Sequence, residues 1–388
     1  MPRSTTLRRT LLAAVAALAL AAGATQAQAQ ESVPVGAVEI LSGPNAAYGT
    51  AIRAGLELAL DEVNGAGGVL GGRKIALDVQ DSAGDKTQAI NAARLLIGRD
   101  KVVAVIGPTL SNEMFAVGPV VNGRKIPIIG TSTTANGITA IGDYVFRTSL
   151  PESDVIPVTL AYAKRRGVKT IALLYANDDA FSKSGYDVMK AAAEQAGLEI
   201  LGTESFGGKD PDFGAQLTKI KAMNPDAVGI SALVEPVSGV LLQARQLGFP
   251  DKTLFIGGNG SNSPKLGEIA GAAANGLIVG SPWFIDKQDP KNEAFVAAFR
   301  KRYGRDPDQF AAQAYDCLHI LAAAINRAGA ADPEKIRAAL MQTNYDGVMG
   351  PFQFTEDRNP ASAKGVVVLQ MEGGRFRIAP DSATQTAQ

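Results

Sequence analysis

Short apolar runs alternate with longer amphipathic windows along most of this chain, and that alternation constrains the fold more than any other feature. The runs VVAVIGP (102–108) and KTIALLYA (169–176) are apolar at nearly every position, as expected of strands buried on both faces. The window DFGAQLTKIKAM (212–223) places Phe213, Leu217 and Ile220 on one helical face. Repeated strand–helix units of this kind predict an α/β fold whose parallel sheets are covered by helices on both faces.

Two interruptions of this rhythm divide the chain into two lobes. The first is RTSLPESD (147–154), and the second is GSPWFIDKQDPKN (280–292). After the second come three expected helices, at 291–303, 307–328 and 333–343, and then two strand-like segments. We predict a first doubly wound lobe from 31–150 plus 282–360 and a second from 151–281 plus 361–388. Several crossings between them would form a hinge beside a cleft.

The first 29 residues are typical of a secretory signal peptide. A basic segment, MPRSTTLRRT, precedes the apolar LLAAVAALALAAGA and the small residues of TQAQAQ. Cleavage is expected after Ala29, with cleavage after Ala27 as the alternative. No Cys stands directly after the apolar run, and no later apolar segment is long enough for a membrane span. We therefore expect a soluble protein exported to the periplasm.

Charge and motif content exclude several classes of function. The 38 positive and 38 negative side chains balance, which argues against nucleic acid as the main partner. The only Cys and the only His, Cys317 and His319, lie in an apolar helical window, and no metal-ligand spacing or nucleophile motif occurs. We therefore expect a protein that is not an enzyme and that uses no metal or cofactor.

Two hydroxyl-rich loops follow apolar runs in the first lobe. VIGPTLSNEMFA (105–116) and IPIIGTSTTANG (126–137) each lead from a strand into several Ser and Thr residues. Ligands of parallel sheets bind outside the carboxyl ends of strands, and helix N-termini attract anions. Helix capping alone would explain one such loop. Two of them in one lobe favour a binding site for a carboxylate.

The order of several segments resembles a known family over essentially the whole mature chain. These segments are SGPNAAYG, NGAGGVLGG, DSAGDKTQA, AVIGPTLS, PIIGTSTT, LLYANDDAFSKSG, LLQARQLG, NGLIVGSPWF and MGPFQFTED. Together they resemble the exported leucine/isoleucine/valine-binding proteins of ABC importers. The resemblance implies a type I periplasmic-binding fold with two lobes, three crossings and closure around a ligand. It also implies a partner permease and ATPase.

The same resemblance implies a set of binding residues. Positions that hold the ligand carboxylate fall on Ser111, Ser132 and Thr134. Pocket positions fall on Tyr48, Phe181, Leu233, Asn259 and Phe310. Trp283 stands near the second crossing, where it would either line the cleft or pack in the hinge.

One departure from the family bears on the ligand. Where amino-acid-binding members place a Glu for the ligand ammonium, this chain has Asn259. A neutral amide does not offset the burial of an ammonium. We therefore expect a monomeric binding protein for a small apolar or aromatic carboxylate, benzoate-like, delivered to a permease. The alternatives are binding of branched-chain amino acids and a role as a ligand-binding sensory module.

Overall fold

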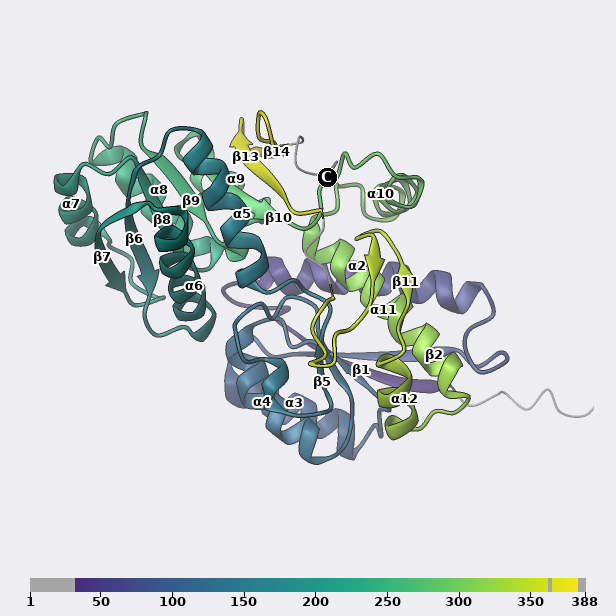
Figure 1. Cartoon of the computed structure of the whole chain (residues 1–388). Helices are drawn as coiled ribbons and strands as arrows, with labels where there is room; N and C mark the ends of the chain where they lie inside the picture. The colour runs from purple at the N-terminus through teal and green to yellow at the C-terminus, as the bar shows by residue number, and fades with distance from the viewer. Residues whose placement is uncertain (1–31, 362–364, 383–388) are drawn as a thin grey trace, which may run out of the picture.

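The computed structural model describes residues 32–361 and 365–382, and it divides into two α/β lobes (Figure 1). The signal peptide predicted over 1–29 lies outside the described residues. In the part of the chain that is described, no helix combines the length and hydropathy that a membrane crossing needs.

The first lobe contains a five-stranded parallel sheet in the order β2-β1-β3-β4-β5. Its strands are β1 (Val33–Glu39), β2 (Ile75–Asp81), β3 (Val105–Ile106), β4 (Ile128–Gly130) and β5 (Val145–Arg147). Helices α3 (Lys86–Gly98) and α4 (Ser111–Gly123) pack on one face, and α2 (Ala46–Gly65) packs on the other. Val35 and Ala37 of β1 face the α2 side and Val38 faces α3 and α4, as a strand's alternation requires.

The second lobe contains a seven-stranded sheet in the order β14-β13-β10-β9-β8-β6-β7. Five strands are parallel: β6 (Thr170–Ala176), β7 (Glu199–Phe206), β8 (Ala227–Ser231), β9 (Leu254–Gly257) and β10 (Ile278–Ser281). The hairpin β13 (Val367–Glu372) and β14 (Arg375–Ile378) adds to β10 in the antiparallel sense, so this sheet is mixed rather than purely parallel.

Helices cover both faces of the second sheet. Helices α5 (Glu152–Arg165) and α6 (Ala180–Ala196) cover one face. The other is covered by α7 (Gly214–Met223), α8 (Val234–Gln246) and α9 (Lys265–Ala270). Residues 171 and 173 of β6 face α5 and α6, and residues 172 and 174 face the helices on the other side. Burial on both faces explains the continuous apolar run.

The chain passes between the sheets three times, after β5, after β10 and before β13. After the second crossing it forms α10 (Pro290–Tyr303), α11 (Gln309–Ala328) and α12 (Pro333–Leu340), and α11 packs against α2 of the first lobe (Figure 1). The strands β11 (Tyr345–Asp346) and β12 (Pro351–Phe352) follow. We propose that the lobes divide at 150/151, 281/282 and 360/361, as predicted from the sequence.

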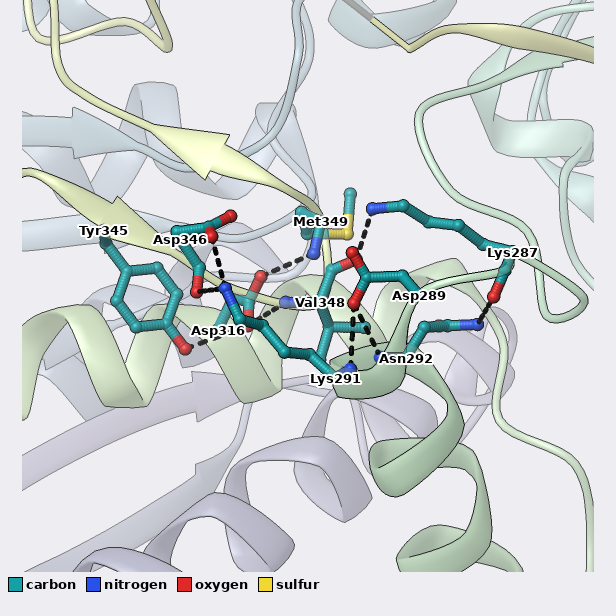
Figure 2. A network of polar contacts seen from close by, with 9 residues as sticks. All are labelled: Lys287, Asp289, Lys291, Asn292, Asp316, Tyr345, Asp346, Val348 and Met349. Atoms are coloured by element: carbon teal, nitrogen blue, oxygen red, sulfur yellow. Dashed lines mark hydrogen bonds and ion pairs between the residues drawn. The ribbon is translucent and has the colours of Figure 1, made fainter.

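A polar network fixes the second crossing to the β11–β12 hairpin (Figure 2). Asp316 of α11 accepts hydrogen bonds from the backbone N–H of Val348 and Met349, at 3.0 and 2.8 Å. Burial raises the pKa of Asp316 to about 6. Lys287 of the crossing donates to the Val348 carbonyl at 3.2 Å. The hairpin therefore ties the crossing to α11, whose N-terminal residues approach the cleft.

Candidate functional site

A cavity of about 20 Å³ lies where the two lobes meet. This space holds about one water molecule, so a larger ligand requires the lobes to part. Its wall is formed by residues of both lobes: Tyr48, Thr109, Leu110, Ser111, Ser132, Phe181, Leu233, Asn259, Gly260 and Phe310.

Helix N-termini converge on this cavity. Ser111 is the first residue of α4, Phe181 and Phe310 are the second residues of α6 and α11, and Leu233 is the N-cap of α8. Tyr48 lies in the first turn of α2. The first N–H groups of a helix have no intrahelical partner and carry partial positive charge. Asp179 caps the start of α6 and Asp308 caps that of α11, so among these helix starts α4 is the one that favours an anion. No Lys or Arg lines the wall in the described part of the chain.

The loop after β3 supplies a hydroxyl whose proton is not donated to any described residue. Gly107 adopts φ +94°, and a Cβ there would meet the Val38 carbonyl oxygen at 2.4 Å, so this turn requires glycine. The Thr109 hydroxyl donates to Glu39 and accepts from the Ile40 N–H, so it is saturated within the protein. The Ser111 hydroxyl accepts from the Ala135 N–H at 3.3 Å and donates to no described residue. Ser111 can therefore donate to a ligand.

The loop after β4 uses its hydroxyls differently. Ser132 lines the cavity, but its hydroxyl donates to the Thr109 carbonyl at 2.6 Å and so braces the two loops together. Thr134 does not line the cavity. Its hydroxyl lies beside the buried carboxyl of Glu152, too loosely for a good hydrogen bond but close enough to oppose the rise in the Glu152 pKa. The structure thus separates Thr134 from the other two predicted carboxylate ligands.

Aromatic rings form the apolar part of the wall. Tyr48 and Phe310 meet edge to face with ring centroids 4.9 Å apart. The Tyr48 hydroxyl donates to the Gly260 carbonyl and accepts from the Val234 N–H at 2.8 Å, so it offers a ligand only its ring. Phe181 and Leu233 complete this wall from the second lobe.

Asn259 contributes the polar group of the second lobe. Its backbone N–H donates to Glu152 at 3.0 Å, and its Oδ1 accepts from Gln309 at 2.8 Å. Burial raises the pKa of Glu152 to about 7. A buried acid thus stands one layer behind the cavity wall, already engaged by the protein.

Trp283 lies away from the cavity. Its indole N–H donates to Asn292 Oδ1 at 2.7 Å, and its ring packs against Phe295 in a cluster of the second crossing. Of the two roles left open by the sequence, lining the cleft or packing in the hinge, the structure shows hinge packing.

Three wall residues were missed by sequence reasoning. Thr109 had a visible signal, because it stands in the hydroxyl-rich loop beside Ser111. Leu110 and Gly260 gave none, since an N-cap Leu and a glycine in a turn look ordinary. A Cβ at Gly260 would meet the Ala232 carbonyl at 2.8 Å, so the lobe packing explains this glycine.

Hydrogen bonds between the lobes hold the cleft closed beside the cavity. Asn112, at the start of α4, donates to Asp179 Oδ1 at 2.5 Å and accepts from the Ala180 N–H at 2.7 Å. Asn136 donates through its N–H to Ser184 at 2.9 Å. These contacts join the two lobes without touching the cavity wall.

No cluster of His, Cys, Asp and Glu suited to a metal ion occurs among residues 32–361 and 365–382. Cys317 is fully buried, and burial raises the pKa of its thiol well above the ordinary value.

Comparison with known proteins agrees with this architecture. A family described as periplasmic binding protein matches residues 32–375. The leucine-, isoleucine-, valine-, threonine- and alanine-binding protein of Pseudomonas aeruginosa is 31% identical over 345 residues, which cover 88% of this chain and 90% of that protein.

Two solved structures share the fold. A branched-chain amino acid transporter substrate-binding protein of Streptococcus pneumoniae, in complex with isoleucine, has a TM-score of 0.83 at 30% identity, covering 89% of this chain and 98% of that one. A solute-binding protein of an ABC transporter from Rhodopseudomonas palustris, in complex with benzoate, has a TM-score of 0.81 at 23% identity, covering 89% and 95%.

The match over nearly the whole chain, the shared two-lobed fold and the cavity between the lobes agree with one another. The relatives are periplasmic binding proteins, which supports a periplasmic location. The chain belongs to the periplasmic binding protein family of ABC importers, as a substrate-binding protein of the branched-chain amino acid type.

Proposed function

We propose that this protein binds a small apolar or aromatic monocarboxylate, benzoate-like, in the cavity between its lobes and delivers it to an ABC permease served by an ATPase. The ligand is bound and released without chemical change. The observation that carries the proposal is the cavity wall, which contains no charged side chain of either sign in the described part of the chain.

The electrostatics of this wall favour an anion over a zwitterion. The start of α4 and the Ser111 hydroxyl offer donors to a carboxylate. An ammonium would be desolvated against Asn259 with no carboxylate in contact, which costs several kcal/mol. The fully buried Glu152 lies behind Asn259 and accepts its N–H.

The apolar part of the wall suits a ring or a short branched chain. Tyr48, Phe181 and Phe310 surround the space with aromatic faces and edges. The R. palustris protein, which shares the fold alone, was solved with benzoate, so this fold accommodates such an acid.

Binding of branched-chain amino acids is the second candidate. Two relatives at 30–31% identity are described as binding such amino acids or were solved with isoleucine. In this alternative the ionised Glu152 would offset the ammonium from behind Asn259.

A thermal-shift screen followed by calorimetry tests the proposal. We expect benzoate and hydroxybenzoates to raise the melting temperature, whereas leucine, isoleucine and valine leave it unchanged. A ligand at 100 times its Kd adds about 2.7 kcal/mol of stability, which such a screen detects. Tight leucine binding together with no response to aromatic acids would replace the proposal by the second candidate.

A further inference from the structure

A series of buried, hydrogen-bonded polar groups, here called the amide chain, runs from the second crossing to the cavity wall. Its members are Trp283, Ser281, Asn262, Gln309 and Asn259, each with at most 5% of its surface exposed. Asn259 is the member that lines the cavity. Because donors must meet acceptors at every step, this chain has a definite direction.

The direction is fixed at the backbone of Trp283. The Ser281 hydroxyl donates its single proton to the Trp283 carbonyl, which accepts only. The Trp283 N–H points back at Ser281 Oγ, at 3.3 Å. The approach of Ser281 Oγ to Gln309 Oε1, at 3.4 Å, is too long to compete with the bond to the Trp283 carbonyl. Ser281 Oγ must therefore accept from its remaining neighbour, Asn262.

The direction at Ser281 fixes the orientation of the next two side-chain amides, Asn262 and Gln309. Asn262 presents its NH₂ group to Ser281 Oγ at 2.8 Å and to Gln309 Oε1 at 2.7 Å. With its oxygen occupied in this way, Gln309 turns its own NH₂ group to Asn259 Oδ1 at 2.8 Å. Amide orientations are assigned from such networks, and here backbone groups decide the assignment.

Asn259 is left with one polar group for a ligand. Its N–H donates to Glu152, its carbonyl accepts from the Asn262 N–H at 3.0 Å, and its Oδ1 is taken by Gln309. Its NH₂ group has no partner in the described part of the chain. That group is a donor, which suits an acceptor oxygen and opposes an ammonium.

We propose that Gln309 is a specificity-determining positioning residue, which holds Asn259 with its NH₂ group toward the ligand and so selects ligands bearing an acceptor oxygen there. Gln309 does not line the cavity and acts only through Asn259. This inference rests on the proposed function and deepens it. The acceptor oxygen belongs to the carboxylate or to a ring substituent, and benzoate and 4-hydroxybenzoate separate these two sources.

A neutron structure of the deuterated, ligand-free protein tests the orientation directly. We expect the two deuterons of the Asn259 amide on the atom turned away from Gln309, and deuterons on Gln309 toward Asn259. Deuterons of Asn259 directed at Gln309 would overturn the proposal. This readout requires no ligand, so it stands apart from the proposed function.

Calorimetry with benzoate, 4-hydroxybenzoate and leucine tests the selection. In Gln309→Met, Asn259 loses the donor that orients it, so we expect about two- to tenfold weaker binding of the acids and a smaller preference for them over leucine. Asn259→Asp should reverse the preference toward leucine. An acid loss confined to 4-hydroxybenzoate would assign the acceptor to the ring substituent.

Gln313→Met is the matched control. Gln313 lies one turn further along α11, is equally buried at 2% exposure, and has no part in the amide chain. We expect it to lower stability and leave the ratio of the Kd values for leucine and benzoate unchanged. An unchanged ratio in Gln309→Met would overturn the inference. A wild-type protein that prefers leucine would instead refute the proposed function.

Discussion

The loops after β3 and β4 look alike in the sequence, yet they serve the cavity in different ways. Both follow buried strands of one sheet, and both are rich in hydroxyls. In the first, no described residue accepts the Ser111 proton, whereas in the second Ser132 donates to the Thr109 carbonyl and Thr134 turns toward Glu152. The role of a hydroxyl therefore depends on whether the protein has already used its proton.

The largest expected effect concerns the buried acids behind the two loops. Burial raises the pKa of Glu113, behind the first loop, and of Glu152, behind the second, to about 7. Each folded-state pKa lies above the ordinary 4.5, so the folded protein keeps protons that the unfolded chain releases. Stability should therefore fall as pH rises from about 4.5 to 7, by about 3 kcal/mol for Glu152.

Urea unfolding between pH 4.5 and 8 measures this effect. Glu152→Gln should remove its share of the decrease, and Glu113→Gln should do so separately, because the two carboxyls stand behind different loops. A Gln variant whose stability still varies with pH as in the wild type would show that the acid in question is ionised in the folded protein.

The next effect compares the two serines directly. Ser111→Ala removes a hydrogen bond to a buried charge, which costs about 1.5–3 kcal/mol, so benzoate should bind roughly tenfold to 150-fold more weakly. Ser132→Ala loses a brace between the loops, and its affinity should change less than about threefold. Isothermal titration of both variants measures the difference. Equal losses would mean that the two loops hold the carboxylate jointly.

A smaller effect is expected at the contacts across the cleft. Asn112, beside the first loop, makes two partly buried hydrogen bonds to the second lobe, and Asn136, beside the second loop, makes one exposed bond to Ser184. Two net hydrogen bonds contribute about 1–3 kcal/mol to closure, so Asn112→Ala should weaken benzoate binding by about tenfold.

Small-angle scattering gives the second readout for this pair. The Asn112→Ala protein should have a larger radius of gyration than the wild type at the same benzoate concentration, because more molecules are open. Ser184→Ala should remain close to the wild type. A Ser184→Ala protein that opens more than Asn112→Ala would reverse the ranking of the two contacts.

The smallest effect is expected at Thr134. Its hydroxyl lies outside the cavity wall, so Thr134→Val should change benzoate affinity by less than about threefold. The variant should also raise the pKa of Glu152 further, because the hydroxyl lowers it in the wild type. A loss of affinity as large as that of Ser111→Ala would restore Thr134 as a carboxylate ligand, as the family resemblance implied.

The sequence predicted the fold well because its signals are local and repeated. Apolar runs such as 169–176 indicate strands buried on both faces, and the glycines at 373–374 indicate the final hairpin. The antiparallel addition of that hairpin to β10 was not predicted, because strand direction depends on where the third crossing returns the chain. The family, with its two lobes and three crossings, is confirmed by the comparisons.

For the cavity, the sequence by itself determined which residue types stand at strand ends and helix starts. Seven of the nine predicted positions lie on the cavity wall, since these starts converge in any such two-lobed fold. Only the tertiary structure decided which hydroxyls and amides remain free. Thr134 turns to Glu152, Trp283 packs in the second crossing, and Asn259 takes its orientation from Gln309. Each of these outcomes depends on a partner at least nine residues away, and a local sequence pattern does not record such a partner.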